Sequence, residues 1–105
     1  MKMDRNLVLG GLGKYTLINL RKLSKTPSDE LLNALEVLRK NGIIELGQPN
    51  EADEFFVIKL RDINAHAALT GYAVEADKTD PEWANEVREM LPRSGENSFY
   101  CKQPD

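Results

Sequence analysis

The sequence is poor in the two residue types that most often build disulfides, metal sites and proton-transfer centres: it has one cysteine, Cys101, and one histidine, His66. A single cysteine cannot form an internal disulfide, and the count also excludes a zinc site of four cysteines. A single histidine excludes any catalytic triad, metal cluster or acid–base scheme that needs two histidines in one chain. A reducing compartment is the default, so we expect the protein to be cytoplasmic.

Long hydrophobic runs are also missing. The longest, such as Leu7 to Leu9 and Phe55 to Ile58, are much shorter than the ~20 residues that a membrane-spanning helix needs. The beginning of the chain lacks the apolar core of a signal peptide. The sequence therefore predicts no membrane partner.

Known catalytic and metal-binding motifs are lacking as well. The stretch Gly10–Lys14 resembles a phosphate-binding loop, but Val8 stands where that loop needs its first glycine, and Tyr15 follows the lysine. A hairpin turn is the better interpretation. The acidic clusters around Glu51 and Glu75 do not have the spacing of an EF-hand loop. We therefore expect no catalytic residue, no cofactor and no metal, and a protein that is not an enzyme.

What the chain does contain is typical of one soluble globular domain: 41% of its 105 residues are hydrophobic and 30% are charged. We expect a compact domain over residues 1–92 and a C-terminal tail over residues 93–105. The net charge is −3, with three more basic than acidic residues over residues 1–48 and six more acidic than basic residues over residues 49–105. This balance makes nucleic acid an unlikely partner, although such a dipolar chain can pair with itself head to tail.

Two segments have the pattern of a strand that leads into a helix. Glu54–Ile63 is rich in aromatic and β-branched residues, and Tyr15–Leu23 matches it position by position. A helical interpretation of residues 14–24 stays open, because their apolar residues also recur at helical spacing. Shorter strands are predicted over residues 6–9 and 43–46.

Three segments carry helix signals. The first spans residues 27–41, with Thr26 as the predicted N-cap. The second spans residues 64–76, and its alanine-rich face suits close packing against a sheet, another helix or a second copy of the chain. Gly71 inside it predicts a close contact, because glycine otherwise weakens a helix. The third begins at the sequence Asp80-Pro81-Glu82 and ends before Pro92.

Together these elements predict an α+β fold, in which three helices cover a mixed or antiparallel sheet of about four strands. The order of elements indicates two tandem strand-strand-helix units followed by a C-terminal helix. Arg21 and Arg61 then end equivalent strands, where two guanidinium groups could bind a phosphate or carboxylate ligand. The alternative is that both arginines form ordinary ion pairs, with Asp62, Glu36 or helix ends.

Aromatic side chains are the predicted contacts with a protein partner, because tyrosine and tryptophan often anchor interfaces. These residues are Tyr72 in the alanine-rich helix, Trp83 in the last helix, and Phe99 and Tyr100 in the tail. We expect a homodimer, with the alanine-rich face as one candidate seam.

A resemblance to known proteins rests on four stretches taken together: Glu54–Asp62, the alanine-rich helix with Leu69 and Tyr72, the helix start Asp80-Pro81-Glu82, and the ending Cys101–Asp105. Together they resemble small phage-encoded and prophage-encoded proteins of unknown function. The resemblance implies an accessory role in which the chain acts on a host protein. It supplies no catalytic residues.

Three functions follow from these observations. The first is a non-enzymatic accessory protein that acts through protein–protein interaction. The second is a winged-helix regulator that binds nucleic acid, with residues 27–41 as the recognition helix and residues 43–60 as the wing. Asp29 and Glu30 in the first turn of that helix speak against it, because they repel phosphates. The third is a small domain that binds an anionic ligand through Arg21 and Arg61.

Overall fold

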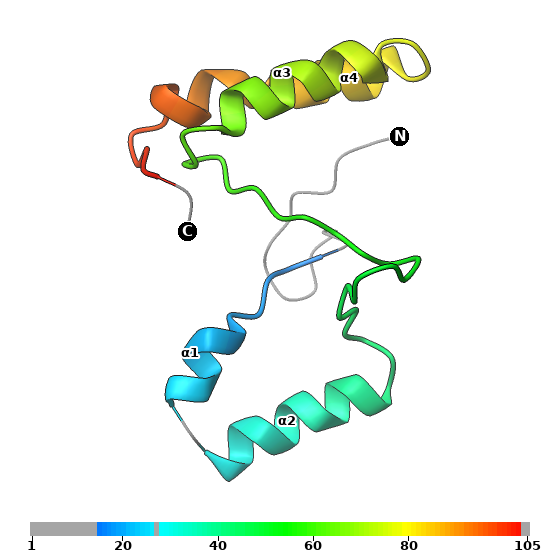
Figure 1. Cartoon of the computed structure of the whole chain (residues 1–105), viewed down its shortest axis with the longest axis vertical. Coiled ribbons are helices and arrows are strands. Elements are labelled where there is room, and N and C mark those ends of the chain that lie inside the picture. Colours follow the sequence, from blue (N-terminus) through cyan, green and yellow to red (C-terminus); the bar gives the residue numbers. More distant parts are fainter. Residues whose placement is uncertain (1–14, 27, 104–105) are drawn as a thin grey trace. The chain divides into compact units, whose positions relative to one another are not determined.

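A computed structural model describes residues 15–26 and 28–103 of the chain. In that part the chain forms four α-helices and two short 3₁₀ helices (Figure 1). Contacts divide it into two compact units, which we call the α1–α2 unit (Tyr15–Phe56) and the hairpin unit (residues 57–103). The elements are α1 (Leu20–Lys25), α2 (Asp29–Lys40), α3 (Ala65–Ala76), α4 (Pro81–Arg88), η1 (Leu91–Arg93) and η2 (Gly95–Asn97).

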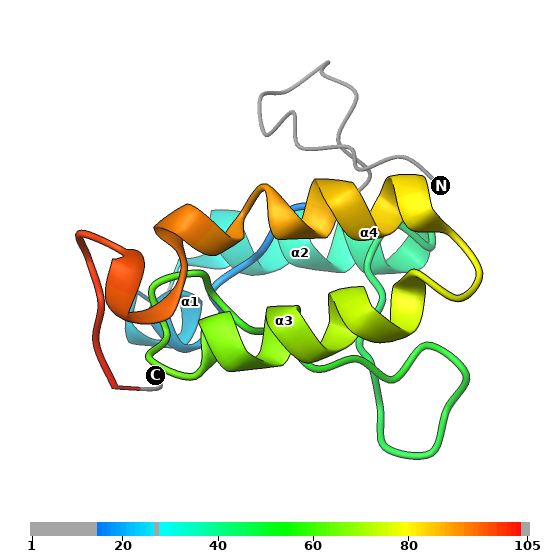
Figure 2. The same cartoon turned by 90° about the horizontal axis from the view of Figure 1, so that it is seen from above.

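In the hairpin unit, α3 and α4 lie side by side and run in opposite directions (Figures 1 and 2). The chain reverses between them, and Asp80 then caps α4 by accepting a hydrogen bond from the backbone N of Trp83 at 3.1 Å. Pro81 follows in the first turn, where its missing N–H removes no helical hydrogen bond. The start of this helix is confirmed, and the predicted helix over residues 64–76 is confirmed as α3.

The core of the hairpin unit is small and lies between these two helices. Ala73, Val87 and Met90 are 1%, 2% and 7% exposed and form one apolar cluster. The side chains of Leu60, Leu69 and Trp83 pack against this cluster. Alanine on α3 lets the helices approach closely, so the alanine-rich face is used for packing inside the unit. The close contact predicted at Gly71 is wrong, because nothing lies within 4 Å of where its Cβ would be.

The chain after α4 folds back on the segment that precedes α3. The backbone N of Gly95 donates a hydrogen bond to the carbonyl of Leu60 at 2.8 Å. Further along, Lys102 N donates to the Arg61 carbonyl and Ile63 N donates to the Lys102 carbonyl, both at 2.9 Å. The C-terminal segment is therefore attached to the hairpin unit up to residue 102. The predicted boundary at residue 92 stays a prediction.

The α1–α2 unit contains one short helix and one longer helix with clear local end signals. Asn19 Oδ1 accepts a hydrogen bond from the N of Lys22 at 2.8 Å and caps α1. The predicted cap of the next helix is wrong: Thr26 ends α1, and Ser28 caps α2. The reason is that the Ser28 hydroxyl stands three residues before the N–H of Leu31 and accepts a hydrogen bond from it at 3.4 Å. Pro27 lies outside the described residues.

Side chains of the α1–α2 unit are exposed or only partly buried in its described residues. Neither α1 nor α2 contains a buried residue. Many large apolar side chains are exposed instead: Tyr15, Leu17, Ile18, Leu20, Leu31, Leu32, Val37, Leu38, Ile43, Leu46, Phe55 and Phe56. The described residues of this unit therefore form helices but no buried core.

The predicted α+β fold is wrong, because the described residues form no β-strand. Residues 15–19, 43–46 and 54–59 have no regular secondary structure, and a single isolated bridge joins Asp62 to Lys102. Aromatic and β-branched residues favour strands when neighbouring strands and a covered face receive them. The described part of the chain offers these segments no such partner. The strand predicted over residues 6–9 lies outside the described residues.

The predicted pair of tandem units is wrong for the same reason. Residues 20–25 form α1, whereas the matching residues 60–65 lead through turns into α3. The similarity of the two segments therefore does not correspond to a repeated structure. The wing predicted over residues 43–60 is also absent, because these residues contain no strand.

Candidate functional site

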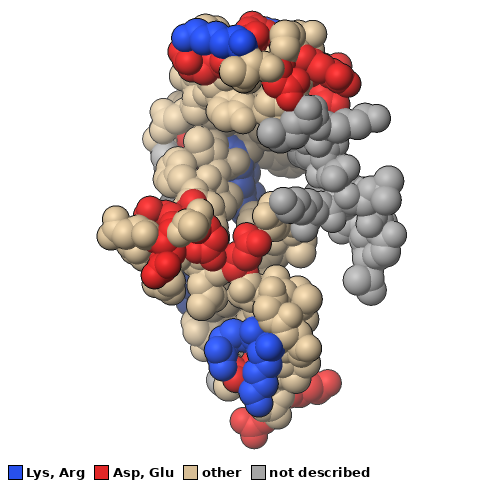
Figure 3. Space-filling view, turned by 90° about the vertical axis from the view of Figure 1, so that its right-hand side faces the viewer, with Lys and Arg blue, Asp and Glu red and all other residues tan. Residues whose placement is uncertain are grey.

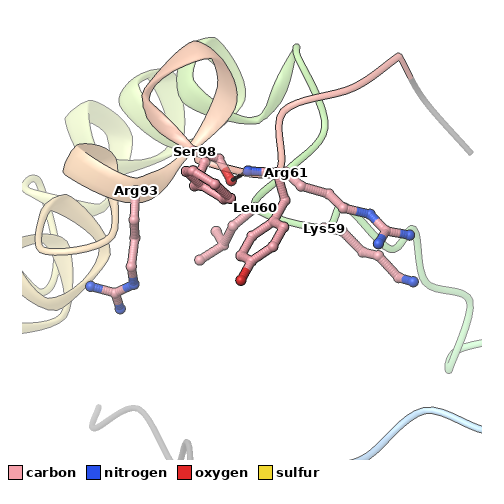
Figure 4. Close-up of a pocket in the computed structure, with 7 residues that line it drawn as sticks. Lys59, Leu60, Arg61, Arg93 and Ser98 are labelled. Carbon is pink, nitrogen blue, oxygen red and sulfur yellow. Dashed lines mark hydrogen bonds between the residues drawn. The ribbon is translucent and has the colours of Figure 1, made fainter.

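An open depression lies on the hairpin unit where the segment before α3 meets the C-terminal segment (Figure 4). Its volume is about 600 Å³. The backbone hydrogen bond between Gly95 and Leu60 brings its two halves together. We call it the basic depression. It is lined by Lys59, Leu60, Arg61, Arg93, Ser98, Phe99 and Tyr100.

The lining of the basic depression includes three cations and no carboxylate. The Lys59 and Arg61 side chains extend to one side of the depression, and the Arg93 side chain extends on the other side (Figure 4). The Arg93 guanidinium donates a hydrogen bond from Nη1 to the backbone carbonyl of Glu89 at 3.1 Å, which holds its stem against the end of α4. The positive charge is thus spread along the depression and is not focused on one point.

The aromatic residues of the depression are exposed to solvent. Phe99 is 94% exposed and Tyr100 is 73% exposed. Their ring centroids lie 5.2 Å apart with an interplanar angle of 82°, which is an edge-to-face pair. The backbone N of Tyr100 donates a hydrogen bond to Ser98 Oγ at 3.1 Å and shapes the turn that carries both rings. This geometry leaves ring surface open next to the cations.

The structure therefore brings together three of the six predicted site residues, Arg61, Phe99 and Tyr100, in one depression. Arg21 lies in α1 of the other unit, where its side chain is exposed. Neither arginine ends a strand, so the argument that paired them is wrong. The sequence analysis missed Lys59 and Arg93. Lys59 could have been found from its spacing of two residues from Arg61, which places both side chains on one side of an extended segment.

The other two residues predicted to contact a protein partner, Tyr72 and Trp83, are hydrogen-bonded to each other within the hairpin unit. Trp83 Nε1 donates a hydrogen bond to the Tyr72 hydroxyl at 2.9 Å. The indole of Trp83 also packs against the core cluster. The pair links α3 to α4, so Trp83 has a structural role, while Tyr72 keeps about half of its surface exposed.

The opposite end of the hairpin unit, where α3 turns into α4, is acidic. Figure 3 shows carboxylate side chains around a cation at this end. Arg88 on α4 donates hydrogen bonds from both terminal nitrogens to the carboxylate of Asp77, with Nη1 to Oδ1 at 3.1 Å. These hydrogen bonds hold the pKa of Asp77 below its ordinary value. The pair connects the end of α3 to α4.

A second candidate surface is the apolar side of α2. Leu31, Ala34, Leu35 and Leu38 recur at helical spacing and form what we call the α2 apolar face. Leu35 is half-buried and the other three are exposed. The first turn of α2 is acidic and the last turn is basic. On the same helix, Arg39 donates two hydrogen bonds to Glu36, at 2.6 and 2.9 Å, and lowers the pKa of that carboxyl.

The only histidine and the only cysteine of the chain lie in different segments of the hairpin unit. His66 is exposed on α3, and Cys101 is a half-buried free thiol. Among residues 15–26 and 28–103, no three or more His, Cys, Asp or Glu side chains lie together as metal ligands do. In the same part of the chain, no helix has both the length and the apolar character that crossing a membrane requires.

Comparison of the chain with protein-family profiles, curated proteins and solved structures found no match in any of the three. The resemblance to phage and prophage proteins stays a prediction. The two candidate surfaces of the chain are the α2 apolar face and the basic depression.

Proposed function

We propose that this chain is a non-enzymatic interaction protein that acts through protein–protein contacts of its α1–α2 unit, and that the partner on α2 is a second copy of the chain. One observation carries the proposal: the α2 apolar face is left uncovered in a unit whose described residues include none that is buried. A stable helix of this kind normally covers its apolar face by packing against another element.

The length of α2 makes such a contact necessary for its stability. A helix of 12 residues is marginal in water on its own, and most of its stability comes from packing of the apolar face. Burying one leucine side chain contributes about 1.5 to 3 kcal/mol. The α2 apolar face carries Leu31, Leu35 and Leu38, so covering it contributes part of the free energy that stabilises the helix.

Charge favours an antiparallel pair of α2 helices. Asp29 and Glu30 lie in the first turn, and Arg39 and Lys40 lie in the last turn. In a two-fold symmetric antiparallel pair, the acidic turn of one copy lies beside the basic turn of the other, and the helix dipoles also oppose each other. A parallel pair would place like charges together. The same face can therefore bind itself in a closed dimer.

Sedimentation or light scattering over a range of protein concentrations tests this proposal. We expect the mass to rise from one to two chains as concentration increases. Leu38→Asp should abolish the rise, because it places a charge within the buried face. Asn33→Asp is the matched control, since it adds the same charge on the opposite side of α2 and should leave the dimer intact.

Two results would contradict the proposal. One is a monomeric mass at high micromolar concentration. The other is an equal loss of self-association in both variants, because that would mean that charge on α2, and not the apolar face, controls assembly.

A further inference from the structure

The basic depression of the hairpin unit combines two features that the dimer proposal does not use, namely spread positive charge and open aromatic rings. We propose that this depression binds single-stranded nucleic acid, with its cations on the phosphates and Phe99 as the surface on which a base stacks. Proteins that bind single strands without sequence preference combine a basic groove with exposed aromatic rings in this way.

The arrangement of charge favours an extended polyanion over a single small anion. The charged ends of Lys59 and Arg61 lie on one side of the depression, and that of Arg93 lies on the other (Figure 4). One phosphate cannot reach all of them, whereas successive phosphates of a strand can. The Ser98 hydroxyl accepts the hydrogen bond from Tyr100 N and keeps its own proton available to donate to a phosphate oxygen.

The carboxylates at the acidic end of the hairpin unit weaken this binding little, because that end is distant from the depression. Asp77 lies at the far end of α3, which has 12 residues and is therefore about 18 Å long. At physiological salt the Debye length is about 8 Å, so charge at that distance is largely screened. Asp62, Glu89 and Glu96 are closer in the sequence, but none of them lines the depression.

The exposed rings decide between a nucleic-acid strand and an acidic protein segment. An acidic peptide of the same charge would satisfy the cations, but its charged residues carry no ring, whereas each nucleotide pairs a phosphate with a flat base that can stack on Phe99, which is 94% exposed. In a duplex the bases already stack on each other and cannot reach the ring. Single strands have accessible base faces together with closely spaced phosphates, so they match both features of the site.

Fluorescence anisotropy with the full-length protein tests the proposal. The probes are a labelled oligothymidylate of about 15 nucleotides, an abasic strand of the same length, a duplex and polyglutamate of equal charge. We expect oligothymidylate to bind at least about fivefold more tightly than each of the other three, because only it provides stacking together with phosphates. Equal binding of polyglutamate would overturn the proposal in favour of an acidic protein partner.

Substitutions at Phe99 separate stacking from charge. Phe99→Ala should weaken oligothymidylate binding by about fivefold or more, whereas Phe99→Tyr should retain it. The matched control is Phe56→Ala, which removes a similarly exposed phenylalanine, 86% exposed, from the α1–α2 unit and should leave binding unchanged. Because Phe99 is almost fully exposed, its removal should leave the unfolding transition in place. Unchanged binding by Phe99→Ala would overturn the proposal.

The cations are tested by the salt dependence of binding. If three cations contact phosphates, the logarithm of the binding constant should fall with the logarithm of salt concentration with a slope of about −2. Lys59→Gln and Arg93→Gln should each make that slope less steep by about 0.7. Lys78→Gln, at the acidic end of the unit, is the control and should not change it. Equal effects of all three substitutions would indicate binding by overall charge and would contradict the site.

Discussion

Helices α2 and α3 both have 12 residues, yet only α3 contributes to a core. Helix α2 has a clear apolar stripe and buries nothing, whereas α3 is apolar on most sides and buries Ala65 and Ala73. The difference lies in what each helix has beside it. Helix α3 is followed after four residues by α4, which returns along it, whereas α2 has only the six-residue α1 before it and irregular chain after it. An amphipathic pattern thus shows which face of a helix can pack against another element. Whether that element belongs to the same unit depends on the segments next to the helix.

The two units should differ most in the loss of stability that follows when one apolar side chain in each is shortened. Met90→Ala should lower the free energy of unfolding of the hairpin unit by about 2 to 5 kcal/mol, because it leaves a cavity in a small core. Leu38→Ala, at an exposed position in α2, should change stability by less than about 1 kcal/mol in dilute protein.

Urea unfolding measures both effects. Fluorescence of Trp83, the only tryptophan of the chain, follows the hairpin unit, and far-UV circular dichroism follows the helices of both units. Similar losses in the two variants would contradict the contrast in burial described above.

A second comparison concerns the stability cost of replacing a glycine with a positive φ by alanine in each unit. Gly95 has φ +57°, and an added Cβ would lie 2.9 Å from the Cβ of His66. Gly95→Ala should therefore destabilise the hairpin unit by about 1 to 3 kcal/mol, through backbone strain and the contact with α3. Gly42 has φ +67° and open space around it, so Gly42→Ala should cost only the backbone term of about 1 kcal/mol. Thermal unfolding followed by circular dichroism compares the two, and an equal cost would mean that the contact at Gly95 is unimportant.

A third substitution should stabilise the hairpin unit. Gly71 lies inside α3 with open space around its Cα, so Gly71→Ala should raise the free energy of unfolding by about 1 kcal/mol. Ala67→Gly, at an exposed position of the same helix, should lower it by a similar amount. Both shifts can be read from urea unfolding followed by Trp83 fluorescence. A loss of stability in Gly71→Ala would contradict the open space around this position.

The smallest effect concerns the pH dependence of stability. Hydrogen bonds from Arg88 lower the pKa of Asp77 in the folded chain, so this pair stabilises the hairpin unit above the ordinary aspartate pKa of 3.8. That contribution falls away as pH drops through the lower folded pKa, where the carboxylate takes up a proton.

Asp77→Asn should therefore flatten the loss of stability of the hairpin unit in acid, measured as the midpoint of thermal unfolding by Trp83 fluorescence. Glu36→Gln is the matched control, because Glu36 also has a lowered pKa but pairs with Arg39 inside α2. The control should leave the Trp83 transition unchanged, and an equal effect of both variants would contradict a specific link between α3 and α4.

Local signals in the sequence were sufficient to predict most of the helices. Asp80 and Pro81 identify the start of α4, since a carboxylate cap and a proline in the first turn act within a few residues. The strand predictions failed because strand propensity depends on neighbouring strands, which the described residues do not provide. For the site, Arg61, Phe99 and Tyr100 were identified singly, but their common depression was not. The two segments that form it are joined by backbone hydrogen bonds, which leave no signal in the side-chain pattern.

The sequence by itself determined the approximate positions of α2, α3 and α4, which faces are apolar and where charge is concentrated, because each of these depends on residues a few positions apart. Tertiary structure alone decided that the alanine-rich face of α3 packs on α4, that the α2 apolar face stays uncovered in its unit, and that Arg93 lines the same depression as Lys59 and Arg61. These outcomes depend on contacts between residues far apart in the chain, and such contacts are fixed by how whole elements pack, not by local propensity.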